Sequence, residues 1–162
     1  PLRIYGTIED QGYFDTEIAP LLGEGVQYGG HLQGADLTEA IARASVLLFT
    51  PLWDEPFGLA AIEAMACGLP IAAVENGAIR EVAGDVAQYA AADAGELAEA
   101  LRAAIGISRS AARKRVERLF TLGRMLGEYE GLYAQAIDVE LEGFDVPPFE
   151  AFELPLLRHA LH

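Results

Sequence analysis

Residues 50–82 read TPLWDEPFGLAAIEAMACGLPIAAVENGAIREV and contain a turn between a strand and a helix. The run before them, Val46–Thr50, is apolar and partly branched, which is typical of a buried strand. Pro56 and Gly58 predict a sharp turn, because proline fixes its backbone and glycine tolerates conformations that other residues avoid. The segment Gly58–Ala66 then has helical spacing. A strand that turns at once into a helix is typical of α/β proteins.

The same alternation extends along most of the chain. Five runs have strand character: Leu2–Tyr5, Gly25–Tyr28, Val46–Thr50, Pro70–Val74 and Val86–Tyr89. Three short helices are expected between them: Asp36–Ala44, Gly58–Ala66 and Ile79–Ala83. Asp36 or Thr38 is the expected N-terminal cap of the first of these helices. Short strands that alternate with helices predict a parallel sheet with helices on its faces.

After residue 92 the pattern changes to helices alone. Apolar residues recur at three- and four-residue spacing over 93–105, 108–120 and 121–137. The basic run from Arg109 to Arg118 lies in the second of these segments, and a solvated helix face is the simplest interpretation of it. We therefore predict an α/β fold, a parallel sheet with flanking helices, followed by a helical C-terminal region.

Composition excludes several classes of function. The 162 residues suit one domain, and 11 Lys and Arg against 25 Asp and Glu give a formal charge of −14, which disfavours nucleic acid as a partner. The sequence has no apolar run long enough for a transmembrane segment. Cys67 is the single cysteine, so no internal disulfide and no multi-cysteine metal site can form. We expect a cytoplasmic protein without a bound metal.

The turn before the predicted helix 58–66 offers a binding site for an anion. The first N–H groups of a helix have no partner within the helix and lie at the positive end of its dipole. Phe57, Gly58 and Leu59 are therefore the candidate donors to a phosphate group. Glu63 lies about 7–8 Å further along the helix, which suits a ribose attached to that phosphate.

Glu55 precedes the helix at the C-terminal rim of the strand, where open α/β sheets bind ligands. With Glu63 it would bracket a diphosphate that carries a sugar at each end, because carboxylates accept strongly from sugar hydroxyls. Spacing alone leaves another interpretation open, in which the two acids stabilise the helix dipole or remain solvated.

The segment EPFGLAAIEAMACGLPI, Glu55–Ile71, resembles the E-x7-E signature of glycosyltransferase family 4. The similarity extends from about Leu2 to Ile137. It implies a Rossmann-like parallel sheet as the C-terminal half of a GT-B fold. It also implies a retaining glycosyltransferase of hexosyltransferase type, with a nucleotide-diphosphate sugar as donor substrate and no further cofactor. It also implies that Glu55, the candidate catalytic residue, contacts the donor sugar, that Glu63 holds the ribose, and that amides of residues 57–59 meet sugar and phosphate.

The resemblance also implies missing parts. The family's opening strand and its N-terminal acceptor domain should precede Pro1, so we expect residues 1–137 to be a nucleotide-sugar-binding domain without its first strand. By itself this fragment should be inactive. The tail, 138–162, is expected to pack on a partner or on the missing domain, because it alternates acidic and bulky apolar residues. Ala78 stands where the family usually has the second glycine of a pair, and Arg80 replaces a common proline.

Other interpretations remain open. A noncatalytic nucleotide-sugar-binding or regulatory module could retain the same signature, whereas a phosphoacceptor domain is disfavoured because no paired acids follow an early strand. Trp53 and Tyr28 could stack on a ligand, although aromatic residues at strand ends more often fill a core or an interface, and Trp53 is the better interface candidate. Cys67 is expected to be a small buried hydrophobic residue.

Overall fold

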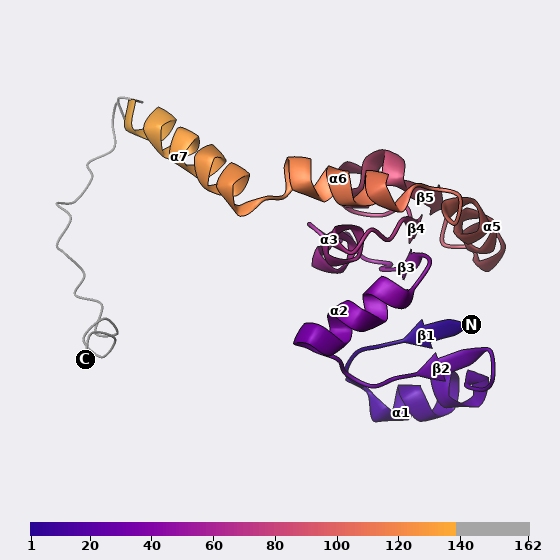
Figure 1. Ribbon diagram of the computed structural model, residues 1–162. Coiled ribbons are helices and arrows are strands. Elements are labelled where there is room, and N and C mark those ends of the chain that lie inside the picture. Colours follow the sequence, from indigo (N-terminus) through magenta and orange to yellow (C-terminus); the bar gives the residue numbers. More distant parts are fainter. Residues whose placement is uncertain (139–162) are drawn as a thin grey trace, which may run out of the picture. The chain divides into compact units, whose positions relative to one another are not determined.

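The computed structural model describes residues 1–138, which Figure 1 shows as a ribbon. The chain divides into two compact units, Pro1–Leu122 and Gly123–His162. The described part of the second unit belongs to one helix, α7 (Leu122–Asp138). The predicted tail, apart from its first residue, lies outside the described residues.

The strands of the first unit occur where the sequence predicts them. They are β1 (Leu2–Ile4), β2 (Val26–Tyr28), β3 (Leu47–Phe49), β4 (Ile71–Val74) and β5 (Ala87–Ala90). β1 pairs with β2 in one sheet, and β3, β4 and β5 form another in that order. Every pairing is parallel. The prediction of parallel strands alternating with helices is therefore confirmed.

The helices that follow these strands are also close to their expected positions. They are α2 (Gly34–Arg43), α3 (Leu59–Ala66), α4 (Ile79–Ala83), α5 (Ala94–Ala104) and α6 (Arg109–Leu119). The predicted cap of α2 is wrong, because the helix begins at Gly34 and so contains both Asp36 and Thr38. Within the helix, the Thr38 hydroxyl donates to the Gly34 carbonyl at 3.0 Å.

One helical segment between β1 and β2 was not expected from the sequence. It consists of α1 (Gln11–Tyr13), a π-helical turn (Phe14–Ile18) and a 3-10 turn (Ala19–Leu21). Asp10 caps it, since its carboxylate accepts from the Tyr13 amide at 2.9 Å. Phe14 packs on Tyr28 of β2 with ring centroids 5.0 Å apart. The segment therefore covers one face of the β1–β2 sheet.

The core of the first unit surrounds β4, whose four residues are all buried. Successive side chains of a strand point to opposite faces. Ile71 and Ala73 join the cluster that contains residues of α3, α4 and α6, whereas Ala72 joins alanines of α5. The strand thus has helices on both faces, with small side chains toward α5. This packing also holds the C-terminal end of β3, after which α3 begins.

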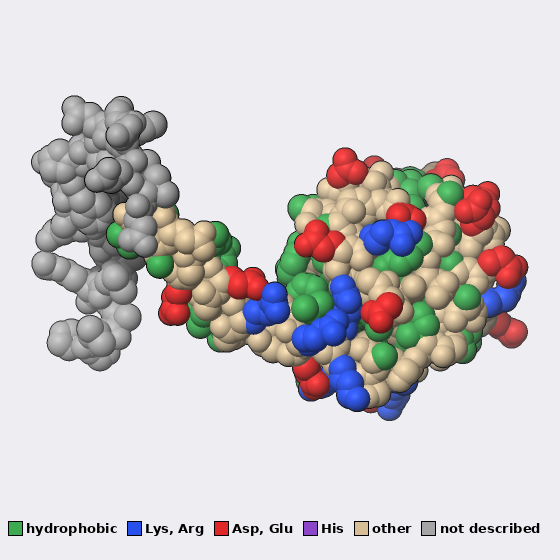
Figure 2. All heavy atoms as spheres, turned by 90° about the horizontal axis from the view of Figure 1, so that it is seen from above, with side chains coloured by type: hydrophobic (Ala, Val, Ile, Leu, Met, Phe, Trp, Pro, Cys, Tyr) green, Lys and Arg blue, Asp and Glu red, His purple; other side chains and the backbone are tan. Residues whose placement is uncertain are grey.

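The basic run of α6 contacts the ends of three other helices, so its interpretation as a solvated face is incomplete. Arg109, Arg113 and Arg115 donate to backbone carbonyls near the C-termini of α2, α3 and α4; the acceptors are Ala42, Ala44, Ala66, Cys67, Glu81 and Val82. Cations at these positions complement the negative ends of helix dipoles. On the face seen in Figure 2, acidic and basic side chains are interspersed.

Candidate functional site

The turn between β3 and α3 depends on Gly58. This residue is the N-cap of α3 and has φ +84°, a left-handed conformation that favours glycine. A Cβ atom here would also lie 3.2 Å from the ring of Phe49 at the end of β3. The tight turn leaves Leu59 and Ala60, at the start of α3, exposed to solvent.

The carboxylate of Glu55 lies at this helix N-terminus and is half-buried. Its Oε1 accepts from the Gly58 amide at 3.2 Å, and its Oε2 accepts from the Trp53 indole Nε1 at 3.0 Å. A negative charge is stabilised there by the helix dipole. Of the three amides predicted to meet a phosphate, that of Gly58 is therefore already bonded to Glu55. The indole contact could not be predicted from the spacing.

The backbone of Glu55 rests against the loop that follows β4. The Ala78 amide donates to the Glu55 carbonyl at 2.9 Å. Gly77 has φ +55°, and a Cβ atom built on it would lie 2.4 Å from the Glu55 carbonyl oxygen and 2.5 Å from its nitrogen. Such approaches exclude every residue with a side chain unless the loop shifts. The sequence suggested a glycine-containing loop here but not its contact with Glu55.

Glu63 lies one turn after Leu59 on the exposed face of α3. Residues four apart on a helix lie on one face, separated by about 6 Å along its axis. The described part of the chain offers the Glu63 carboxylate no hydrogen bond or ion pair, so this group is available to a ligand. Phe57 is 45% exposed and its ring lies 6.0 Å from that of Phe120, in an edge-to-face arrangement.

All five sequence-predicted site residues thus lie between the end of β3 and the middle of α3. The Glu55 carboxylate accepts a hydrogen bond from the Gly58 amide. Leu59 and Glu63 share the exposed face of α3, and Phe57 lies between the two acids in the sequence. Their roles in binding stay predictions. Cys67 is half-buried at the C-cap of α3 and belongs to the end of the helix remote from these residues.

A charged pair joins the end of β4 to the first turn of α4, on either side of Gly77. Arg80 forms two hydrogen bonds with the Glu75 carboxylate and lies over the Tyr89 ring, 4.3 Å from its centroid. The hydrogen bond from Arg80 lowers the pKa of Glu75, and the same bond raises the pKa of Arg80. Burial raises the pKa of Tyr89. Arg80, which stands where the resemblance places a proline, therefore has its charge matched within the protein.

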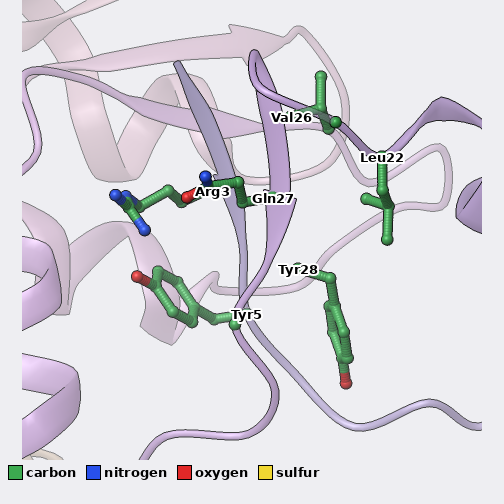
Figure 3. A pocket seen from close by; sticks show the side chains of 8 residues that line it. Arg3, Tyr5, Leu22, Val26, Gln27 and Tyr28 are labelled. Carbon is green, nitrogen blue, oxygen red and sulfur yellow. The ribbon is translucent and has the colours of Figure 1, made fainter.

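A cavity of about 440 Å³ lies away from these residues, at the β1–β2 sheet. Figure 3 shows Arg3 and Tyr5 on one side of the two strands and Leu22 and Tyr28 on the other. The Tyr28 hydroxyl donates to the Gly6 carbonyl at 2.6 Å. The Tyr28 ring also packs on Phe14. These two contacts give Tyr28 a role in packing the β1–β2 sheet, as expected for an aromatic residue at a strand end.

Two further features concern the described residues alone. Within residues 1–138, no group of three or more His, Cys, Asp or Glu side chains is arranged to hold a metal ion. The helices in that same range are too short or too polar to cross a membrane.

Comparisons with known proteins agree with this architecture. The family model "Glycosyl transferases group 1" matches residues 1–118. AviGT4, a glycosyltransferase involved in avilamycin A biosynthesis, is similar in structure with a TM-score of 0.73 and 24% identity, over 84% of this chain and 43% of that one. Sucrose-phosphate synthase from Thermosynechococcus elongatus gives a TM-score of 0.69 and 26% identity, over 84% of this chain and 38% of that one.

A more distant structure has the same fold. The pneumococcal O-GlcNAc transferase GtfA, in complex with UDP and GlcNAc, gives a TM-score of 0.58 and 18% identity, over 85% of this chain and 29% of that one. The chain thus spans less than half the length of each of these three proteins. No curated protein sequence matches it significantly. The similarities confirm the predicted Rossmann-like α/β fold with parallel strands and flanking helices.

Proposed function

Because the chain belongs to the group 1 glycosyltransferases, we propose that it is the C-terminal, donor-binding domain of a retaining enzyme of glycosyltransferase family 4. The enzyme transfers a hexose from a nucleotide-diphosphate sugar to an acceptor. A separate N-terminal domain of the same GT-B protein binds that acceptor. The donor is a substrate, and neither a metal nor another cofactor takes part. The compartment we propose is the cytoplasm.

The arrangement at the start of α3 supports this proposal. The N-terminus of the helix is open, with Leu59 and Ala60 exposed, and two carboxylates lie beside it. A diphosphate bound there meets backbone N–H groups at the positive end of the dipole. The same N–H groups stabilise the charge that develops on the diphosphate as it leaves the sugar.

Each acid then has its own part of the donor. Glu63, whose carboxylate is available on the outer face of α3, accepts from the ribose hydroxyls. Glu55 accepts from hydroxyls of the sugar that is transferred, and it keeps its bond to the Gly58 amide while the diphosphate binds the amides that follow. Bonds between charged and polar groups are among the stronger hydrogen bonds, so each acid contributes to donor recognition.

The division of the strands into two sheets supports a further part of the proposal, that a strand outside this chain completes the domain. Within the described residues, β1 pairs only with β2, and β3 pairs only with β4, so each of these two strands has one unpaired edge. The dinucleotide-binding type of doubly wound sheet has the strand order 3-2-1-4-5-6. The order β2-β1 and β3-β4-β5 fits this scheme with the position of the first strand open between β1 and β3.

The decisive experiment is a donor screen with the full-length protein. UDP-, GDP-, ADP- and dTDP-linked hexoses are incubated with candidate acceptors, and the anomeric configuration of any product is determined by NMR. We expect transfer with retention from one class of donor, and no transfer by the 162-residue chain alone. Donor binding without transfer or hydrolysis by the full-length protein would instead indicate a noncatalytic binding module.

Variants of the two acids test their separate roles. Glu63→Ala should weaken the nucleoside diphosphate and the nucleotide sugar alike, by about one to two decades, because the ribose is common to both. Glu55→Gln should leave the nucleoside diphosphate almost unaffected while turnover falls. Calorimetry with both ligands measures the difference. Equal loss of nucleoside diphosphate affinity in the two variants would contradict the assignment.

A further inference from the structure

Trp53 forms two hydrogen bonds with Glu55, in opposite directions. Its indole N–H donates to Glu55 Oε2 at 3.0 Å, and its backbone carbonyl accepts from the Glu55 amide at 2.8 Å. The two residues are separated by only one position. The pair therefore closes a small ring of contacts in the turn after β3, and the indole can move little without releasing the carboxylate.

Packing does not explain the position of this indole. The Trp53 side chain is 64% exposed and belongs to neither hydrophobic cluster of the described residues. A large aromatic ring gains most of its stabilisation from burial, and this ring has little of it. Here the hydrogen bond to Glu55 is what orients the ring.

The remaining contacts of Glu55 come from the backbone. The Gly58 amide holds one carboxylate oxygen, and the Ala78 amide holds the Glu55 carbonyl. A carboxylate held at one oxygen can still rotate about its last side-chain bond, which has a broad torsional preference. The indole N–H is the second point of attachment and removes that freedom.

We propose that Trp53 is a positioning residue for Glu55, whose indole N–H fixes the orientation in which the carboxylate meets the transferred sugar. This inference rests on the proposed function, because it assumes that Glu55 contacts the donor. A carboxylate already oriented when the donor arrives avoids the entropy cost of ordering it during binding and transfer. Trp53 need not touch the nucleotide.

The test uses Trp53→Phe in the full-length enzyme, because phenylalanine keeps an aromatic ring and lacks the N–H. We expect kcat/KM for the donor chosen in the screen to fall about 10-fold, while calorimetry shows unchanged affinity for its nucleoside diphosphate. In the double variant Trp53→Phe/Glu55→Gln, turnover should match that of Glu55→Gln alone, because Trp53 acts only through the Glu55 carboxylate, which that substitution has already removed.

Two controls separate positioning from simpler roles. Tyr13 is another exposed aromatic residue, with 59% of its surface accessible, and Tyr13→Phe should leave turnover unchanged. Thermal unfolding followed by circular dichroism should show all variants folded, since Trp53 lies outside the core. Trp53→Leu should impair turnover no less than Trp53→Phe, because both lack the N–H.

Four outcomes would overturn the inference. Normal turnover by Trp53→Phe together with loss in Trp53→Leu would mean that the ring covers an interface with another domain. Additive losses in the double variant would mean that Trp53 acts independently of Glu55. Normal turnover by Glu55→Gln would overturn the proposed function and the inference with it. Reduced turnover by Glu55→Gln together with normal turnover by Trp53→Phe would overturn the inference alone.

Discussion

Gly77→Ala should destabilise the protein far more than an ordinary substitution of glycine in a loop. The residue has φ +55°, where a residue with a side chain costs roughly 1–2 kcal/mol. The added methyl group would also lie 2.4 Å from the Glu55 carbonyl oxygen, well inside contact distance. Relieving such overpacking typically costs another 1–3 kcal/mol or so. Together the two effects predict a loss of about 2–5 kcal/mol in the free energy of unfolding.

Gly34→Ala is the matched control. Gly34 also has φ +55°, but nothing lies within 4 Å of a Cβ atom built on it. It therefore reports the backbone cost alone, about 1–2 kcal/mol. Urea denaturation of the 162-residue chain, followed by circular dichroism, gives both values in one assay.

The difference between the two variants isolates the collision with Glu55. We expect Gly77→Ala to lose about 1–3 kcal/mol more than Gly34→Ala, with equal slopes of the unfolding transitions. Transition midpoints that coincide for the two variants would refute the reasoning, because they would show that the loop after β4 does not press on the Glu55 backbone.

Two further predictions concern charged residues. Arg115→Met should lower the free energy of unfolding by about 2–3 kcal/mol in urea denaturation, because the Arg115 side chain is only 13% exposed and its loss leaves two carbonyls without a donor. Arg118 is exposed, so Arg118→Met should change that free energy by less than about 0.5 kcal/mol. Equal losses in the two variants would contradict the role of Arg115. The lowered pKa of Glu75 means that its pair with Arg80 stabilises the fold above the ordinary pKa of a glutamate and that this contribution is lost as pH falls through the lowered pKa. NMR titration should show the pKa of Glu75 rising toward its ordinary value in Arg80→Met, and an unchanged pKa would exclude the hydrogen bond as the cause.

Local patterns were sufficient to predict the strands and the α3 turn. β3 and β4 are continuous apolar runs, with Pro51 after the first and Pro70 before the second, and Pro56 and Gly58 mark where the chain turns. The segment between β1 and β2 was missed, because its π-helical and 3-10 turns lack the 3.6-residue period and it contains Gly12 and Pro20.

The environment of Glu55 could be predicted only in part. Its position before a helix N-terminus follows from the sequence, whereas its bonds depend on how the turn closes. The Gly77–Ala78 loop lies more than twenty residues away in the sequence, so no local pattern relates it to Glu55. The basic run was identified correctly, but the partners of Arg109 and Arg115 are 33 to 67 residues distant. Such contacts are decided by tertiary packing.

The arginines of α6 should couple the folding of segments that are distant in the sequence. The last carbonyls of α2, α3 and α4 find their donors on α6, which follows all three helices in the sequence. Until α6 docks, the carbonyls that accept from these arginines must bond to water, so the three helix ends should fray together and become protected from hydrogen exchange together. During synthesis, the C-terminal end of α3 would thus gain its side-chain donors only after residue 113 has left the ribosome.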